Sequence, residues 1–288
     1  MKTRREFIKK AGKGLLAAGV FAPLSGGIAN ASECGIAGQR GAGQNDLFKI
    51  SFAGYTFRDY DLDTTLEMMQ KTDAHYLCIK DFHLPLTGTN DEIAAFHAKL
   101  AAKNVAGCGV GPIYMSSESE VDRAFEYIRR VGVKLLVGVP NHELLPYVDK
   151  KVKEYNVCVA IHIHGPDNPL YPDSDDVFRH IADLDTRIGV CLDIAHTTRN
   201  GADPVRDLKK YHKRVFDIHL NDTVEASKAG KLCALGRGIV NIPAFVQTLR
   251  KVKYSGFCNI ELVADKENCL AAAAESIGYI KGVANATR

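Results

Sequence analysis

The chain has 288 residues and a formal net charge of +3 at pH 7. Its first 31 residues carry six lysines and arginines against one glutamate, a net of +5, so the remaining chain has a formal charge of −2. The charge pattern therefore excludes a basic nucleic-acid-binding surface, and no apolar run after residue 31 is long enough to span a bilayer.

The first 31 residues resemble a twin-arginine export signal. Arg4 and Arg5 stand in a charged start, a short apolar stretch follows, and Ala29-Asn30-Ala31 offers a small-residue cleavage site. An N-terminal amphipathic helix of the mature fold is the alternative. We expect residues 1–31 to be removed on export of the folded chain through the twin-arginine machinery, and the mature protein to be periplasmic.

Residues 32–46 are rich in Gly, Ala and Ser and predict a flexible linker. Eight cysteines in an exported protein would suggest disulfides. Yet Cys78, Cys158, Cys191 and Cys258 lie inside apolar strand-like runs, where cysteine behaves as a small buried hydrophobe. We therefore expect mostly free thiols.

From residue 47 onward, short apolar runs alternate with longer stretches of helical periodicity, which indicates repeated βα units. The predicted strands are Phe48–Phe57, Tyr76–Lys80, Val105–Val110, Lys134–Val139, Val157–His164, Ile188–Ile194, Val215–Leu220 and Phe257–Val263. The predicted helices are Leu62–Thr72, Asp91–Lys103, Glu118–Val131, Glu143–Tyr155, Ser174–Leu184, Pro204–Lys213, Pro243–Lys253 and Glu267–Lys281.

Eight such units predict a single (β/α)8 TIM barrel over residues 47–288, a fold of about 250 residues. An open doubly wound sheet is the alternative, but no Gly-rich fingerprint follows the first strand. In a barrel, the functional residues lie at the C-terminal ends of the strands.

Groups that bind metals follow four successive predicted strands. His162 and His164 end the fifth strand two positions apart, so they point to the same side of it. The next three strands end in Asp193 with His196, in His219 with Asp222, and in Glu261. We predict that one divalent ion, Mn, Zn, Co or Fe, is bound by two imidazoles and two carboxylates: His162, Asp193, His219 and Glu261.

Residues Leu47 to Lys281 resemble the xylose isomerase-like TIM-barrel superfamily, which includes sugar-phosphate isomerases and epimerases. The resemblance rests on SFAGYTFRDYDLDTTLEMM after the start of the barrel, the D-x-x-H from Asp193, the HLND from His219, and LGRGIVNIPAFVQTL before the last strand. It implies that Asp193, His219 and Glu261 bind a divalent metal, and that His196 and Arg237 contact the substrate.

The fifth strand departs from the superfamily pattern. Epimerases of this superfamily usually have a glutamate where His162 stands, and that glutamate is both a ligand and one of two acid/base carboxylates. His162 still suits a metal, but a two-glutamate mechanism is not implied. Same-side geometry also leaves open whether His162 or His164 is the ligand, and the resemblance favours His162, with His164 facing the substrate.

The expected chemistry is removal of a proton next to a carbonyl, with the metal polarising that carbonyl. Glu261 is the first candidate for the base, and His164 and His196 are alternatives. The remaining candidates are less specific. Lys80 is a candidate for binding an enolate oxygen, or for only an ion pair with Asp81, and Arg237 is a candidate for binding an enolate oxygen or a hydroxyl. Tyr55 is a candidate for stacking on a sugar, or for only packing, and Asp222 for contacting the substrate or for orienting His219.

These expectations describe a metal-dependent isomerase or epimerase of a sugar or sugar derivative. A lyase or hydratase acting on a 3-keto-glycoside or related keto-sugar is the first alternative, and a non-catalytic sugar-binding barrel is the second. The expected partners are a small carbohydrate and the export machinery, with no nucleic acid and no stable membrane insertion; the sequence leaves a homo-oligomer open.

Overall fold

The computed structural model describes residues 48–288. The predicted signal peptide over residues 1–31 and the predicted linker over residues 32–46 lie outside these residues. Within the described range, no helix is both long and apolar enough to cross a membrane.

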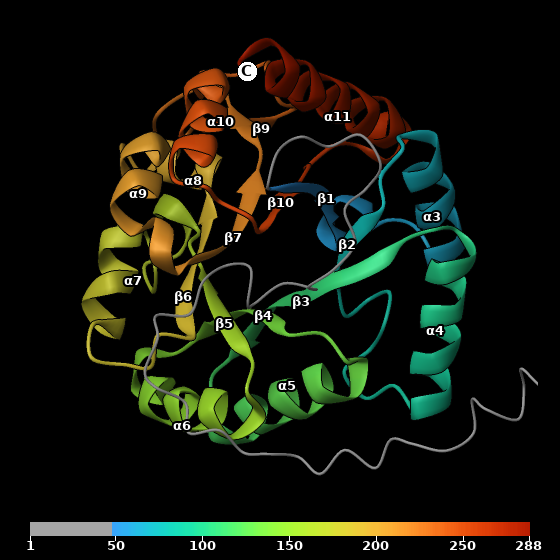
Figure 1. Ribbon diagram of the computed structural model, residues 1–288, viewed down its shortest axis with the longest axis vertical. Helices are drawn as coiled ribbons and strands as arrows, with labels where there is room; N and C mark the ends of the chain where they lie inside the picture. The colour runs from blue at the N-terminus through green and yellow to red at the C-terminus, as the bar shows by residue number, and fades with distance from the viewer. Residues whose placement is uncertain (1–47) are drawn as a thin grey trace, which may run out of the picture.

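The centre of the fold is a closed barrel of eight parallel strands, in which each strand pairs with the next and the last pairs with the first (Figure 1). Lys49 of the first strand lies opposite Phe257 of the last. The barrel part of the fold prediction is confirmed. The strands are β1 (Lys49–Ala53), β2 (Tyr76–Ile79), β3 (Ala106–Met115), β4 (Leu135–Pro140), β5 (Cys158–His162), β6 (Ile188–Asp193), β7 (Val215–Leu220) and β10 (Phe257–Ile260).

Helices connect the strands and surround the barrel (Figure 1). They are α3 (Leu62–Lys71), α4 (Asn90–Ala102), α5 (Glu118–Val131), α6 (Leu145–Tyr155), α7 (Ser174–Ile181), α8 (Ile194–Arg199), α9 (Pro204–Tyr211), α10 (Ile242–Lys251) and α11 (Cys269–Ala286). Short 3₁₀ turns are η1 (Gly54–Phe57), η2 (His142–Leu144), η3 (Gly165–Asp167), η4 (His212–Arg214) and η5 (Lys266–Asn268). An antiparallel pair, β8 (Asp222–Thr223) and β9 (Leu232–Cys233), follows β7.

Local side chains determine where several helices begin and end. Thr89 accepts a hydrogen bond from the Glu92 amide, and Glu92 bonds back to the Thr89 amide, a capping box that starts α4. Ser117 caps α5, and Gly132 ends it at φ 77°, the left-handed conformation that favours glycine. These ends match the predicted helices to within one residue.

The predicted ends were wrong by three or more residues at three strands, and the last of these ends at Ile260 rather than Val263. The first strand ends at Ala53 rather than Phe57, because residues 54–57 turn into η1. The third continues to Met115 rather than stopping at Val110, after a register shift between Val110 and Ile113. At the shift, Gly111 has φ 125°, and a Cβ there would lie 2.1 Å from the Val137 carbonyl oxygen, so only glycine fits.

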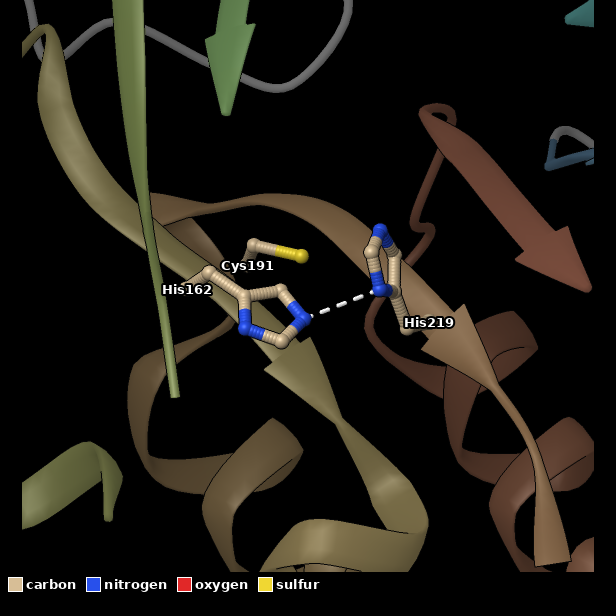
Figure 2. Close-up of side chains that lie close together, drawn as sticks. All are labelled: His162, Cys191 and His219. Carbon is tan, nitrogen blue, oxygen red and sulfur yellow. Dashed lines mark hydrogen bonds between the residues drawn. The ribbon is translucent and has the colours of Figure 1, made fainter. Parts of the chain in front are cut away.

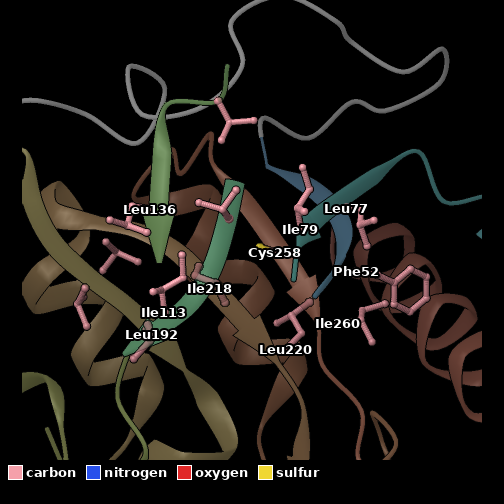
Figure 3. Packing of buried hydrophobic residues seen from close by; sticks show 14 of the residues in the cluster. Phe52, Leu77, Ile79, Ile113, Leu136, Leu192, Ile218, Leu220, Cys258 and Ile260 are labelled. Carbon is pink, nitrogen blue, oxygen red and sulfur yellow. The ribbon is translucent and has the colours of Figure 1, made fainter. Parts of the chain in front are cut away.

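Buried apolar side chains form two layers. The larger lies between the strands and the helices, and Figure 3 shows part of it, including Leu77, Leu136 and Ile218. The smaller fills the barrel interior: Tyr76, Cys78, Cys108, Leu135, Val137, Cys158, Ala160, Cys191, Phe216 and Phe257. Because strand side chains alternate, His162 lies two residues beyond inward-facing Ala160, and Asp193 two beyond Cys191. The polar residues at the strand ends therefore continue the inward-facing positions of their strands.

Six described cysteines are free thiols: Cys78, Cys108, Cys191, Cys233, Cys258 and Cys269. Cys158 is disulfide-bonded, so the expectation of a buried free thiol was wrong for that residue. Its place at the start of β5, in an apolar run, gave no local signal of a covalent partner.

Asp185, in the loop before β6, gives the fold an acid-sensitive contact. Its carboxylate accepts bonds from the Arg187 amide, Nε and Nη2 at 2.8–3.0 Å. The Arg187 side chain holds the pKa of Asp185 at about 2, against an ordinary 3.8. A depressed folded-state pKa stabilises the protein above about pH 4, and this contribution is lost as the pH falls through 2.

We therefore expect Asp185→Asn to lower the free energy of unfolding by about 1–2 kcal/mol at pH 7 and by much less near pH 2. Urea unfolding at a series of pH values measures the difference between the variant and the wild type. Asp183→Asn, an exposed neighbour, serves as the control. An equal loss of stability at both pH values would contradict the assignment.

Candidate metal centre

Two buried histidines face each other at the C-terminal ends of the strands, which we call the mouth of the barrel (Figure 2). His162 ends β5 and His219 lies near the end of β7. His162 Nε2 is 2.9 Å from His219 Nδ1, and the two residues are 2% and 0% exposed. The distance and burial bring two potential nitrogen ligands to one point.

Two carboxylates complete the group. Glu261 Oε2 lies 3.1 Å from His219 Nδ1, and Asp193 Oδ2 lies 3.9 Å from His162 Nε2 and 4.0 Å from His219 Nδ1. Donor atoms of all four residues lie within 4.8 Å of one another. Ligands about 2.0–2.2 Å from a zinc-sized ion are roughly 3–4 Å apart, so these donors fit one divalent ion. We call His162, Asp193, His219 and Glu261 the four-donor cluster.

The charges within the four-donor cluster depend on one another. Burial, reinforced by His164, lowers the pKa of His162 well below its ordinary value, and burial raises the pKa of Asp193. Burial by itself would also lower the pKa of His219 and raise the pKa of Glu261, because it disfavours the charged form of each. For His219 the neighbouring carboxylates of Glu261 and Asp217 outweigh it and raise the pKa, while His219 lowers the pKa of Glu261.

Cys191 offers a second way to complete the histidine pair. Its thiol also lies close enough for a shared ion with His162 and His219 (Figure 2). However, burial raises the pKa of Cys191 well above its ordinary value, and a protonated thiol is a poor ligand. Its Sγ also lies 3.6 Å from Asp217 Oδ2, below the mouth. We therefore assign Cys191 to the floor of the site.

A polar column reaches the four-donor cluster from within the barrel. Ser51 Oγ donates to Asn259 Oδ1 at 2.7 Å, and Asn259 Nδ2 donates to Asp217 Oδ1 at 2.6 Å. Asp217 Oδ2 lies 3.5 Å from His219 Nε2, a nitrogen that has no hydrogen bond and is fully enclosed. The column places a carboxylate behind His219, the position from which a carboxylate orients a ligating imidazole.

Asn221 performs the corresponding role for Asp193, and the sequence analysis did not identify it. Asn221 Nδ2 donates to Asp193 Oδ2 at 2.7 Å, and Asn221 Oδ1 accepts from the Ala195 amide. The other oxygen of Asp193 accepts from the His196 amide at 2.7 Å, which caps α8. Both Asp193 oxygens are therefore held in place. The HLND sequence contained this residue, between His219 and Asp222.

His164 lies on the solvent side of His162, at a Nδ1–Nδ1 distance of 3.3 Å. Its Nε2 lies 2.8 Å from the hydroxyl of Tyr114, which sequence analysis also missed. Burial, with the charge of His196 second, lowers the pKa of His164 to about 4, so it is neutral at pH 7. If His162 Nε2 gives its lone pair to an ion, His162 Nδ1 carries the ring proton and donates a hydrogen bond to His164 Nδ1. His164 would then hold the His162 ring in the orientation that binds the ion.

His196 is held in one tautomer by an arginine. Arg199 Nη1 lies 3.2 Å from His196 Nδ1, and arginine can only donate, so His196 Nε2 carries the proton. Arg199 also pairs with Asp167 of η3 and donates to the Lys228 carbonyl. In this arrangement the His196 ring has an N–H to donate, and its one lone pair is directed at Arg199.

The other predicted site residues are less central. Lys80 donates to the Pro112 carbonyl at 2.7 Å and pairs with Asp81 at 3.0 Å, the alternative considered for it. Arg237 pairs with Glu275 of α11 at 2.6 Å, and its side chain is 66% exposed. Neither side chain is bonded to the four-donor cluster.

Tyr55 is 38% exposed and has the Arg58 guanidinium 5.1 Å from its ring centre. It belongs to a set of exposed large apolar residues that all lie at or beyond the C-terminal end of a strand, before the next barrel helix. Across the described range these residues are Tyr55, Phe82, Tyr114, Val224, Ile239 and Val263. We call them the apolar rim.

The structure does not bring Asp222, predicted to contact substrate or to orient His219, into hydrogen bonding with the four-donor cluster. Its two carboxylate oxygens accept four backbone hydrogen bonds at 2.9–3.0 Å, from Thr223, Gly236, Gly238 and Val240. Asp222 is fully buried. It therefore fixes the loop that precedes α10, and no sequence spacing could distinguish that role from a site role.

We expect His162→Ala and Glu261→Gln each to reduce the affinity for a divalent ion by more than about 100-fold, because even outer partners of a metal site contribute 10–100-fold. Cys191→Ala is the control and should retain the ion. Calorimetric titration of the metal-free protein with Zn²⁺ or Mn²⁺ measures the affinities. Unchanged metal affinity in both His162→Ala and Glu261→Gln would contradict the assignment of these residues as metal ligands.

Comparison with known proteins identifies the family of this chain. A model of the family described as xylose isomerase-like TIM barrel matches residues 66–283. Among curated proteins, none matches the chain.

Several solved structures share the fold. The IolI protein with a bound zinc atom is 18% identical, with a TM-score of 0.61 over 83% of this chain and 98% of its own. The "probable 3-DHS dehydratase" AsbF from Bacillus anthracis is 13% identical, with a TM-score of 0.63 over 81% and 99%. D-psicose 3-epimerase from Clostridium cellulolyticum H10 is 14% identical, with a TM-score of 0.65 over 82% and 99%.

At these identities the solved structures support the fold alone, while the family match extends over most of the chain. The closed barrel of the structure agrees with the fold of the matching family. The chain belongs to the xylose isomerase-like TIM barrel family.

Proposed function

We propose that this protein is a metal-dependent isomerase or epimerase that acts on a sugar or sugar derivative by removing a proton next to a carbonyl. The observation that carries the proposal is the four-donor cluster: two imidazoles and two carboxylates, buried together at the mouth with donor atoms within 4.8 Å. A buried group of this composition needs a shared cation or shared protons.

The family neighbours support the same general chemistry. The solved structures with this fold include an epimerase, a dehydratase and a protein with bound zinc. His162, Asp193, His219 and Glu261 are the residues that would hold the ion. The ion, when bound, supplies a Lewis acid that polarises a carbonyl oxygen.

The surrounding residues fit the handling of a polar substrate. Glu261 is 9% exposed, against 0–2% for the other three donors, so it is the member of the cluster nearest to an incoming molecule and the first candidate for the base. In this proposal His196 Nε2–H donates to a substrate oxygen. The phenol of Tyr114, at the edge of the mouth and bonded to His164, offers a further polar contact.

A lyase acting on a 3-keto-glycoside or related keto-sugar is the second candidate, and His162 favours it. Epimerisation by two carboxylates takes a proton from one face and returns one to the other, but this chain has an imidazole at the fifth strand. Elimination needs one base: the proton leaves the carbon next to the carbonyl, a C=C bond forms, and the β C–O bond breaks. An acid then protonates the departing oxygen. A sugar-binding barrel without turnover is the third candidate.

Turnover in deuterated water separates these candidates. We expect the metal-loaded protein to introduce deuterium beside the carbonyl of a ketose among the candidates offered, detected by NMR and mass spectrometry. A chelator or Glu261→Gln should abolish the exchange, and Asp183→Asn should not. An unsaturated product from a 3-keto-glycoside would favour the lyase instead. Binding of these sugars without exchange or product would contradict both enzyme assignments.

We also propose that the chain is exported to the periplasm by the twin-arginine pathway, since the paired Arg4 and Arg5 precede an apolar stretch and a small-residue cleavage site. In a bacterial host with that pathway, the full chain should yield a shortened periplasmic product. Replacing both arginines with lysine should hold the chain in the cytoplasm. An unprocessed cytoplasmic wild-type chain would contradict the proposal.

A further inference from the structure

A second group of metal-binding side chains lies outside the four-donor cluster. His142 begins η2 after β4, and Asp176 and His180 lie four residues apart on α7, after β5. One donor atom from each of the three lies within 4.8 Å of the others. Residues four apart on a helix share a face, so α7 presents two of the donors together and η2 brings the third.

The hydrogen bonds of the two histidines leave one lone pair on each ring. His142 Nε2 lies 2.7 Å from the Leu170 carbonyl oxygen, and His180 Nδ1 lies 2.9 Å from the Asp176 carbonyl oxygen. A carbonyl only accepts, so these two nitrogens carry the protons. His142 Nδ1 and His180 Nε2 are then acceptors. Ligating histidines commonly donate their other ring N–H to a backbone carbonyl in this way.

Asp176 adds an unpartnered buried oxygen. The residue is 8% exposed, and its Oδ1 accepts from Arg179 Nη1 at 2.7 Å. Its Oδ2 is enclosed and has no hydrogen bond. His180 Nδ1 lies 3.6 Å from this oxygen, but it is already directed to the Asp176 carbonyl. A buried carboxylate oxygen without a partner costs free energy, and a cation would remove that cost.

We propose that His142, Asp176 and His180 form a second binding site, for a divalent transition metal of the zinc class. Two imidazoles and one carboxylate are a set that suits Zn²⁺, and three protein ligands leave a fourth position for water. The His180 side chain is 30% exposed, so solvent reaches that position. The two rings stack, with centres 3.8 Å apart and planes 19° apart, so both imidazoles lie together at the proposed site.

This second site is separate from the four-donor cluster but is joined to it through Tyr171. The buried Tyr171 ring lies 4.8 Å from the His142 ring and 6.3 Å from the His180 ring. The Tyr171 carbonyl accepts from the His164 amide at 3.2 Å, and its hydroxyl donates to the Pro140 carbonyl. An ion at the second site would thus tie α7 to the end of β4, beside the segment that carries His164.

The proposal is tested by counting Zn²⁺ bound to the metal-free full-length protein, with calorimetry for affinities and plasma mass spectrometry after desalting for stoichiometry. We expect two ions per wild-type chain and one in each of His142→Ala, His180→Ala and Asp176→Asn. Glu261→Gln should lose the other ion. His212→Ala is the matched control, since its Nδ1 also lies near a backbone carbonyl a few residues earlier in the chain, that of Lys209, at 3.1 Å.

The outcomes separate this proposal from the proposed function. One ion that is lost in His180→Ala and kept in Glu261→Gln would support the second site and count against the first. One ion that is kept in all three second-site variants, with unchanged affinity, would overturn the second site. If an alanine variant unfolds, as judged by circular dichroism, His180→Gln replaces it. Anomalous diffraction at the zinc edge must also place a peak among His142, Asp176 and His180, and its absence from zinc-soaked crystals would overturn the site.

Discussion

The burial of mutually dependent polar groups at the mouth is the constraint around which the protein is organised. His162, Asp193 and His219 are almost completely enclosed, and Glu261 nearly so. None could be buried alone without a large cost in desolvation. The barrel solves this by ending four adjacent strands at one place, so that each imidazole has a carboxylate or another imidazole within about 3–4 Å. Fold and candidate chemistry are therefore consequences of the same arrangement.

Much of this arrangement could be predicted from local patterns. The alternation of apolar runs with helical stretches indicates the barrel, and side-chain alternation predicts that His162, Asp193 and His219 point inward, because each follows an inward-facing residue by two positions. That convergence needs no knowledge of distant contacts. Closure of the barrel brings strand ends together even when they are a hundred residues apart.

The residues that position the cluster could not be predicted in the same way. Asn221 matters because its amide reaches Asp193 on the next strand, and Tyr114 because the register shift after Val110 extends β3 beside His164. Asp222 is the opposite case: it stands in a site-like sequence, but its carboxylate accepts backbone hydrogen bonds from a loop up to 18 residues away. Such partners depend on loop paths, which local periodicity does not describe.

The apolar rim has a consequence for how the protein can change. Its six side chains come from different loops, and each is at least 38% exposed, so none contributes much to the core. The four-donor cluster, in contrast, is built into the strands. Substitutions on the rim can therefore accumulate with little loss of stability, while the four-donor cluster stays in place. The loops at the mouth can therefore change in sequence while the barrel keeps its fold.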